Sequence, residues 1–146
     1  MQVTFFSNFL NHHQTPFCDE MYSHFGNDFT FVSTEELTDE MRHNGYLDYT
    51  NCPYLLNSYF SNDNFKKAIR LGLVSDVVII GSAPEIFIKE RLKQNKHTFR
   101  YSERFLKQGE WRLFDPRVIY SLLRYHTQYR KKNVYMLIMC VYCYSL

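Results

Sequence analysis

The chain has few of the features that mark secreted or membrane-spanning proteins. It contains only four cysteines in 146 residues, and its amino terminus has no basic segment followed by a long apolar run and a small-residue cleavage site. The apolar stretch Val134–Leu146 is well short of the roughly 20 residues that a transmembrane helix needs. We therefore expect a protein of a reducing, cytoplasmic compartment with no membrane span.

Several motifs that would define an activity are also missing. The chain has no GxGxxG fingerprint, which disfavours an NAD enzyme, and no DxD-like metal signature. Cys140 and Cys143 have CxxC spacing but lack the further ligands of a zinc site and the helix start of a redox site. The strand Val77–Ile80 runs into Gly81, without a phospho-acceptor Asp, which excludes a response-regulator receiver domain. No metal and no cofactor are expected.

Apolar residues are abundant, and charge is unevenly distributed. Hydrophobic residues make up 45% and aromatic residues 18% of the chain, which indicates one folded domain rather than disorder. Up to Ser82 there are four Lys/Arg against ten Asp/Glu, and from Ala83 onward thirteen against five. The basic second half could meet an anionic substrate or the inner membrane surface, as a peripheral contact, or it could simply be a solvated face.

Strand-like and helix-like segments alternate with short connections, which is typical of a parallel α/β sheet. We expect strands at Val3–Ser7, Phe29–Ser33, Tyr54–Tyr59, Val77–Ile80, Thr98–Glu103 and from Asn133. We expect helices from about His12 to Phe25, from the N-cap Thr34, from Asn62 or Asp63, from Ser82 to about Asn95, and from Asp115–Pro116 to near Lys131–Lys132. The helix from Asn62 or Asp63 should bury Phe65, Ile69 and Leu73. The helix from Asp115–Pro116 should direct Val118, Leu122 and Tyr125 toward the core. The predicted fold is a single Rossmann-like, doubly wound α/β domain.

Two adjacent histidines, His12 and His13, follow the first strand, and ligands of open α/β sheets bind at the carboxyl ends of such strands. An imidazole can act as a base at neutral pH, and a helix N-terminus favours its neutral form. The alternative is a structural role, with a ring bonded to backbone at the helix start. Because neighbouring helical side chains point about 100° apart, we expect at most one of them to face the site.

Two further segments could bind anions. After the central strand Val77–Ile80, Ser82 could cap a helix and form a capping box with Glu85, so that backbone N–H groups from Gly81 onward would face an anion. The alternative is a plain capped turn. The segment Arg100–Arg104 could bind a phosphate or carboxylate through its guanidinium groups, or Glu103 could pair with Arg100 or Arg104 internally.

Four segments resemble a known family: VTFFSNFLNHHQ, SDVVIIGSAPE, IKERLKQNKHTFRYSER and RYHTQYRKKNVYML. They are similar to the amino-terminal half of bacterial glycosyltransferases of the two-domain GT-B type, related to those of surface polysaccharide assembly. The resemblance extends to about Ile138. It implies a first domain that shapes the acceptor side of a cleft, and a second domain, not found in this chain, that binds the nucleotide sugar.

The resemblance also implies which residues line that cleft: Ser7, Asn8, Asn11, His12, His13, Gly81, Ser82, Glu85, Arg100, Glu103 and Arg104. His12 or His13 would deprotonate the acceptor hydroxyl, while helix dipoles and cationic side chains stabilise the departing diphosphate. The partners would be a nucleotide sugar and a carbohydrate or lipid-linked acceptor, with no nucleic acid. We expect the chain by itself to be inactive.

Where the family continues into a small-residue stretch, this chain reads MCVYCYSL. A one-base shift in one possible encoding of Ile138–Leu146 produces a stretch that resembles the family's continuation. We therefore hypothesise a domain over residues 1–138 and a frameshifted tail over residues 139–146. The alternative function is a stand-alone Rossmann-like binding module that acts with a separately encoded catalytic domain.

Overall fold

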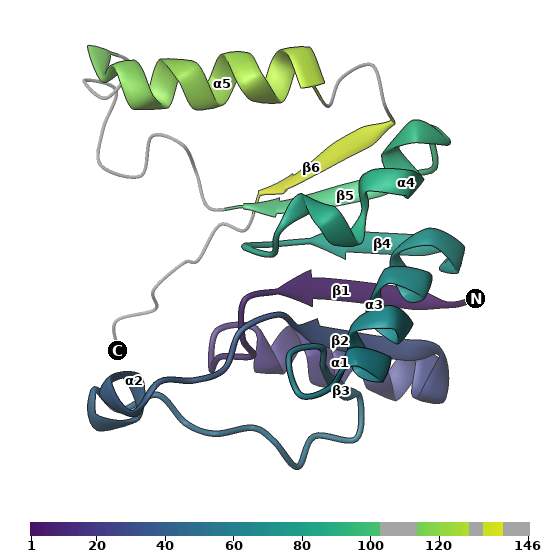
Figure 1. The fold of residues 1–146 in the computed structure, drawn as a ribbon, viewed down its shortest axis with the longest axis vertical. Helices are drawn as coiled ribbons and strands as arrows, with labels where there is room; N and C mark the ends of the chain where they lie inside the picture. Colours follow the sequence, from purple (N-terminus) through teal and green to yellow (C-terminus); the bar gives the residue numbers. More distant parts are fainter. Residues whose placement is uncertain (103–113, 129–132, 139–146) are drawn as a thin grey trace.

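A six-stranded, all-parallel sheet forms the centre of the molecule, in the strand order β3-β2-β1-β4-β5-β6 (Figure 1). The computed structural model describes residues 1–102, 114–128 and 133–138. The strands are β1 (Val3–Ser7), β2 (Phe29–Ser33), β3 (Leu55–Asn57), β4 (Val77–Ile80), β5 (Thr98–Ser102) and β6 (Val134–Ile138). This order, with helices on both faces, confirms the predicted Rossmann-like α/β fold.

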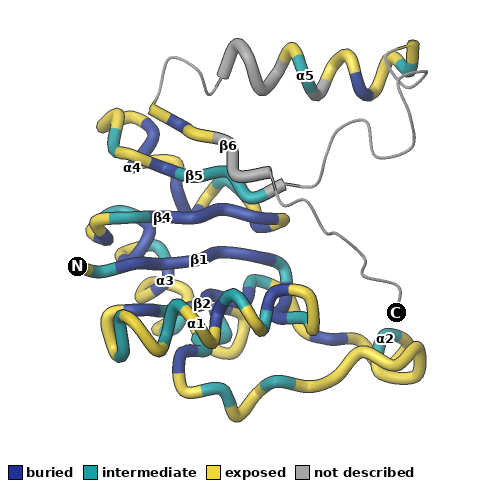
Figure 2. Tube along the Cα trace, turned by 180° about the vertical axis from the view of Figure 1, so that it is seen from behind, coloured by how far each residue is buried: buried dark blue, intermediate teal, exposed yellow. Residues whose placement is uncertain are grey.

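The helices connect the strands in chain order. They are α1 (Thr15–Phe25), α2 (Asp39–His43), α3 (Asn62–Val74), α4 (Lys89–Lys93) and α5 (Pro116–Gln128), with short 3₁₀ turns η1 (Gly26–Asp28) and η2 (Glu85–Phe87). Helix α1 lies on one face of the sheet, and α3 and α4 lie on the other (Figures 1 and 2). Helix α5 lies beyond β6 in both views. None of the described helices is long and apolar enough to cross a membrane.

Strand β1 is central because it pairs with both β2 and β4, and Val3 is level with Phe29 on one side and Val77 on the other. All five of its residues are buried (Figure 2). Alternation sends Phe5 to the α1 face and Phe6 to the α3 face. A continuous apolar run is therefore required here, since both sides of the strand are covered.

Helix α3 contacts the sheet through a stripe that matches the prediction only in part, because Ile69 packs against the core as predicted but Phe65 is not buried. Its buried residues are Ala68, Leu71 and Gly72, whereas Phe65 is 37% exposed. Gly72 decides this, because a Cβ atom there would lie 1.9 Å from the Phe87 carbonyl oxygen. The helix comes this close to η2 only with glycine at that position.

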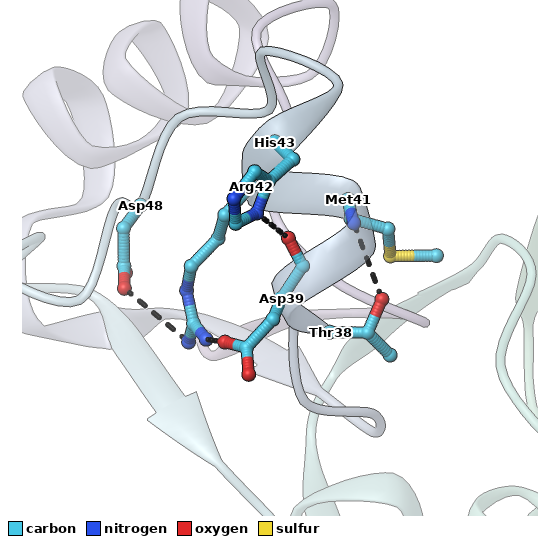
Figure 3. Close-up of polar contacts among 6 residues, drawn as sticks. All are labelled: Thr38, Asp39, Met41, Arg42, His43 and Asp48. Atoms are coloured by element: carbon cyan, nitrogen blue, oxygen red, sulfur yellow. Dashed lines mark hydrogen bonds and ion pairs between the residues drawn. The ribbon is translucent and has the colours of Figure 1, made fainter.

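The predicted helix starts at Thr34, His12 and Ser82 are wrong. Thr34 begins no helix, because its N–H bonds to the carbonyl oxygens of Ser7 and Asn8. Helix α2 begins five residues later, where the Thr38 hydroxyl accepts from the Met41 N–H (Figure 3). Helix α1 begins at Thr15 rather than His12, after a turn in which Asn11 accepts the Gln14 and Thr15 N–H groups.

Other predictions agree with the structure or fall outside it. Strands β1, β2 and β4 have the predicted bounds, Gly26 ends α1 with a positive φ of 52°, and helix α5 begins at Pro116. In α5, Val118 is buried and Leu122 half-buried as predicted. The Tyr125 side chain, Lys131, Lys132, Cys140, Cys143 and the tail 139–146 lie outside the described residues.

Candidate functional site

The loop after β1 is held in place by the loop after β2. The Asn8 carbonyl oxygen accepts from the Thr34 N–H at 2.9 Å, the Glu35 N–H at 2.8 Å and the Ser33 hydroxyl at 2.9 Å. The Ser7 carbonyl accepts from both the N–H and the hydroxyl of Thr34. Backbone hydrogen bonds thus fix the position of the predicted site loop at the carboxyl edge of the sheet.

Ser7 and Gly81 meet at the point where the strand order reverses, between β1 and β4. The Gly81 N–H donates to the Phe6 carbonyl at 2.7 Å, and a Cβ at Gly81 would lie 3.1 Å from the Ser7 hydroxyl. Ser7 donates to the Asn8 side-chain oxygen at 3.2 Å. The structure therefore brings Ser7, Asn8 and Gly81 together at the switch point of the sheet, where ligands of such folds bind.

Gln14 also belongs to this group, although no pattern in the sequence singled it out. It is 6% exposed, and its side-chain nitrogen donates to the Ser7 hydroxyl at 3.1 Å. Its Oε1 has no hydrogen-bond partner in the described structure. Gln14 thus connects the turn that carries the histidines to the end of β1.

His12 and His13 occupy the turn between Asn11 and α1, and both are exposed. The Asn11 side-chain oxygen accepts from the His13 N–H at 3.0 Å and the Gln14 N–H at 3.2 Å, so this amide orders the turn. The two imidazole centroids are 3.8 Å apart. The predicted divergence is therefore wrong, because the residues precede the helix and the helical 100° spacing does not apply.

In the described structure neither imidazole makes a hydrogen bond to the protein. The two rings instead lie beside each other at the surface, in front of the α1 N-terminus. An imidazole in this position can accept a proton from a ligand that enters from solvent.

The turn after β4 differs from the prediction. Pro84 precedes the 3₁₀ turn η2 and Ile88 precedes α4, and no side chain caps either. Ser82 is exposed and caps no helix, so the predicted capping box with Glu85 is wrong. The physical reason is that Pro84 is extended, with ψ of 142°, and not helical. A helix N-terminus for an anion is therefore not formed at Gly81–Ala83.

The arginine segment lies only partly within the described structure. Arg100 is in β5, level with Ile80 of β4, and so it shares the α3 face with Ile80. Ser7 alternates with Phe6 and lies on the opposite face. The fold does not place Arg100 on the same sheet face as Ser7. Glu103 and Arg104 lie outside the described residues.

A cavity of about 150 Å³ lies beside the site loop, at the carboxyl ends of β2 and β3. Phe9 and Leu10 of the loop line it together with residues 35–37, Arg42 of α2, the segment 48–50 before β3, and the turn after β3. Its charged and amide side chains are Glu35, Glu36, Arg42, Asp48 and Asn57. The only sequence signal for it was the excess of acidic residues in the first half, which did not indicate a location.

The fold and the switch-point residues define a Rossmann-like α/β domain with a loop site at the carboxyl edge of its sheet. Comparison of the chain with protein-family models, with curated proteins and with solved structures finds no match in any of the three. Within residues 1–102, 114–128 and 133–138, no three His, Cys, Asp or Glu side chains gather as metal ligands.

Proposed function

We propose that this chain is the acceptor-side domain of a two-domain glycosyltransferase that transfers a sugar from a nucleotide donor to a carbohydrate or lipid-linked acceptor. The observation that carries the proposal is the position of His12 and His13. They follow β1, the strand at the switch point, and they precede the N-terminus of α1. The resemblance of the segments around this turn to such enzymes supports the same assignment.

In this proposal one of the two imidazoles accepts the proton of the acceptor hydroxyl as that oxygen attacks the anomeric carbon of the donor. The bond from that carbon to the diphosphate oxygen breaks, and the nucleoside diphosphate leaves. Asn11 and Gln14 hold the turn and so position the base. General-base catalysis of this kind contributes about 10²–10⁴-fold in rate.

The donor side is proposed to come from a second α/β domain, on the opposite wall of the cleft. The test begins with the DNA after codon 146, translated in all three frames. We expect an α/β domain there, in a shifted frame or as a separate gene, and we expect this chain together with that domain to transfer sugar from nucleotide sugars to a membrane lipid extract. The chain alone should show no transfer.

The base is tested in the same assay with the double variant His12→Ala/His13→Ala. We expect transfer to fall about 10²-fold or more. The control is His24→Ala, which removes an exposed imidazole from the other end of α1, where it pairs with Glu20 at 3.0 Å. The absence of a downstream domain together with no transfer would overturn the proposal, and full activity of the double variant would overturn the assignment of the base.

A further inference from the structure

The cavity at the ends of β2 and β3 has the size of one six-membered ring. Its volume is about 150 Å³, and an apolar protein cavity of roughly that volume accepts benzene. It is too small for a drug-sized ligand, which occupies about 300 Å³ or more. A ligand that enters it therefore inserts a single ring and leaves the rest of the molecule outside.

Aromatic side chains line this cavity from a firmly held turn. Tyr59 and Phe60 directly follow Ser58, whose N–H and hydroxyl both donate to the Ser33 carbonyl at 2.9 Å. Phe60 is 78% exposed and Tyr59 39% exposed, although both are large. Phe9 also lines the cavity, and its ring contacts that of Tyr46 edge-to-face, with the centroids 5.6 Å apart. Exposed aromatic faces at the rim of a cavity offer flat apolar surface to a ring.

The polar groups of the cavity mostly accept hydrogen bonds. Glu35, Glu36 and Asn57 line it, and within the described parts of the chain no hydrogen bond or ion pair engages their side chains. The backbone of Glu35 is held at the cavity, because its N–H donates to the Asn8 carbonyl at 2.8 Å, and its side chain is exposed. These side chains can receive the O–H or N–H groups of a ligand.

The one cation in the lining, Arg42, is already paired. Its guanidinium lies 2.9 Å from Asp39 and 3.8 Å from Asp48 (Figure 3). Burial raises the pKa of Tyr59, and the carboxylates Glu36 and Asp48 raise it further, which Arg42 partly offsets, so this hydroxyl stays a hydrogen-bond donor and acceptor. Three carboxylates against one paired guanidinium repel an anionic ligand and attract a cationic one.

We infer that this cavity binds one sugar ring that carries hydroxyl or amino donors and no negative charge, with Tyr59 and Phe60 against the ring and Glu35, Glu36 and Asn57 on its polar groups. An amino-bearing ring binds more tightly than its neutral analogue. The inference rests on the proposed function for its biological role, since it locates the ring of the acceptor. The cavity itself is defined by residues separate from His12 and His13.

Monosaccharide binding to the full chain tests this inference, with chemical shifts of backbone amides followed by NMR. The probes share one ring and differ in charge: D-glucosamine, D-glucose and D-glucuronate. A ligand of this size should bind with a Kd on the order of millimolar. We expect glucosamine to bind about three-fold or more tightly than glucose, because charge-assisted hydrogen bonds are the stronger ones, and we expect no binding of glucuronate. Shifts should centre on the turn after β3.

Variants separate the ring contacts from the charge. Tyr59→Ala/Phe60→Ala should abolish binding of both sugars, whereas Tyr120→Ala, which removes an exposed tyrosine of α5, should change nothing. Glu35→Gln/Glu36→Gln should remove the preference for glucosamine and keep glucose binding. Glu20→Gln, an exposed glutamate on α1, is the matched control.

Three results would overturn the inference: no shift with any sugar, glucuronate binding as tightly as glucosamine, or cyclohexylammonium binding as tightly as glucosamine. The last would show simple attraction of a cation to acidic side chains. Binding is measured on this chain without a donor, so a failure of binding is distinguishable from a failure of sugar transfer. Binding without transfer in the earlier assay would support the cavity as a sugar site and refute the transferase role.

Discussion

Replacement of Arg91 should strongly destabilise the domain. Arg91 is 1% exposed, although it carries a permanent charge, and no carboxylate among the described residues forms an ion pair with it. It donates instead to three backbone carbonyl oxygens, those of Ser75, Asp76 at 2.9 Å and His97 at 2.6 Å. Burial lowers its pKa, which Asp76 partly offsets, and the guanidinium stays protonated at neutral pH. Arg91 thus ties the starts of β4 and β5 to helix α4.

The size of the effect follows from those carbonyl groups. In Arg91→Met, three carbonyl oxygens and the Thr98 hydroxyl oxygen lose their charged donor. Each buried acceptor left without a partner costs about 1–3 kcal/mol. A cavity of about 230 Å³ adjoins Arg91, and water that enters it can replace part of the loss. We therefore expect a loss near the lower end, about 3–5 kcal/mol, which is a large share of a typical total of about 5–15 kcal/mol.

Urea unfolding followed by circular dichroism measures this loss as a lower midpoint at unchanged slope. Arg91→Lys keeps the charge but cannot reach three carbonyls in a planar fork, so we expect an intermediate loss of about 2 kcal/mol. The control is Arg117→Met, whose side chain is 94% exposed, with an expected change within about 0.5 kcal/mol. A loss below about 1 kcal/mol in Arg91→Met would refute the reasoning.

Three further predictions concern other buried groups. Gly72→Ala should lower the free energy of unfolding by about 1–3 kcal/mol in the same urea assay, because the added Cβ would lie 1.9 Å from the Phe87 carbonyl oxygen. An unchanged midpoint would contradict the close approach of α3 to η2. Burial raises the pKa of the Cys18 thiol, so iodoacetamide at pH 8 should modify Cys52 well before Cys18. Peptide mass spectrometry measures the two rates, and equal rates would contradict this prediction. Burial and the hydrogen bond to Asp19 at 2.7 Å raise the pKa of Tyr54. The contribution of Tyr54 to stability is therefore complete below the ordinary tyrosine pKa of about 10, and it is lost as pH rises above that value. Tyr54→Phe should cost about 1 kcal/mol at pH 7 and reduce the alkaline loss, whereas a steeper loss would refute this.

The strands were predictable because burial on both faces leaves a strong trace in the residues. Val77–Ile80 is a run of β-branched residues, and the structure has β4 with those bounds. Phe29–Ser33 was likewise bounded correctly by the glycine turn before it and the polar residues after it. Central parallel strands need no partner-specific information to be recognised.

The helix starts were less predictable because tertiary hydrogen bonds compete with local capping. Thr34 and Ser82 both have good N-cap chemistry. Thr34 donates instead to the loop after β1, and the extended Pro84 delays the helix after Ser82. These outcomes depend on neighbours that are far away in sequence.

The position of the candidate site loop was predictable, but the side chains around it were not. The topology rule located the loop after β1, and Ser7, Asn8 and Gly81 do lie together. Gln14 and the cavity beside Phe9 were missed, because each depends on side chains from several elements that no spacing along the chain connects. The role of His12 and His13 in catalysis stays a prediction.

The central position of β1 has a consequence for the order of folding. Strand β1 is synthesised before both of its partners, and it pairs on one side with β2 and on the other with β4, whose residues emerge more than seventy positions later. Until Val77–Ile80 is synthesised, β1 has one open edge of unpaired backbone groups next to a strongly apolar surface. Contacts of such long sequence separation are slow to form. We therefore expect nascent chains that stop before β4 to depend on chaperones, and chains that extend past it to become protease-resistant in one step.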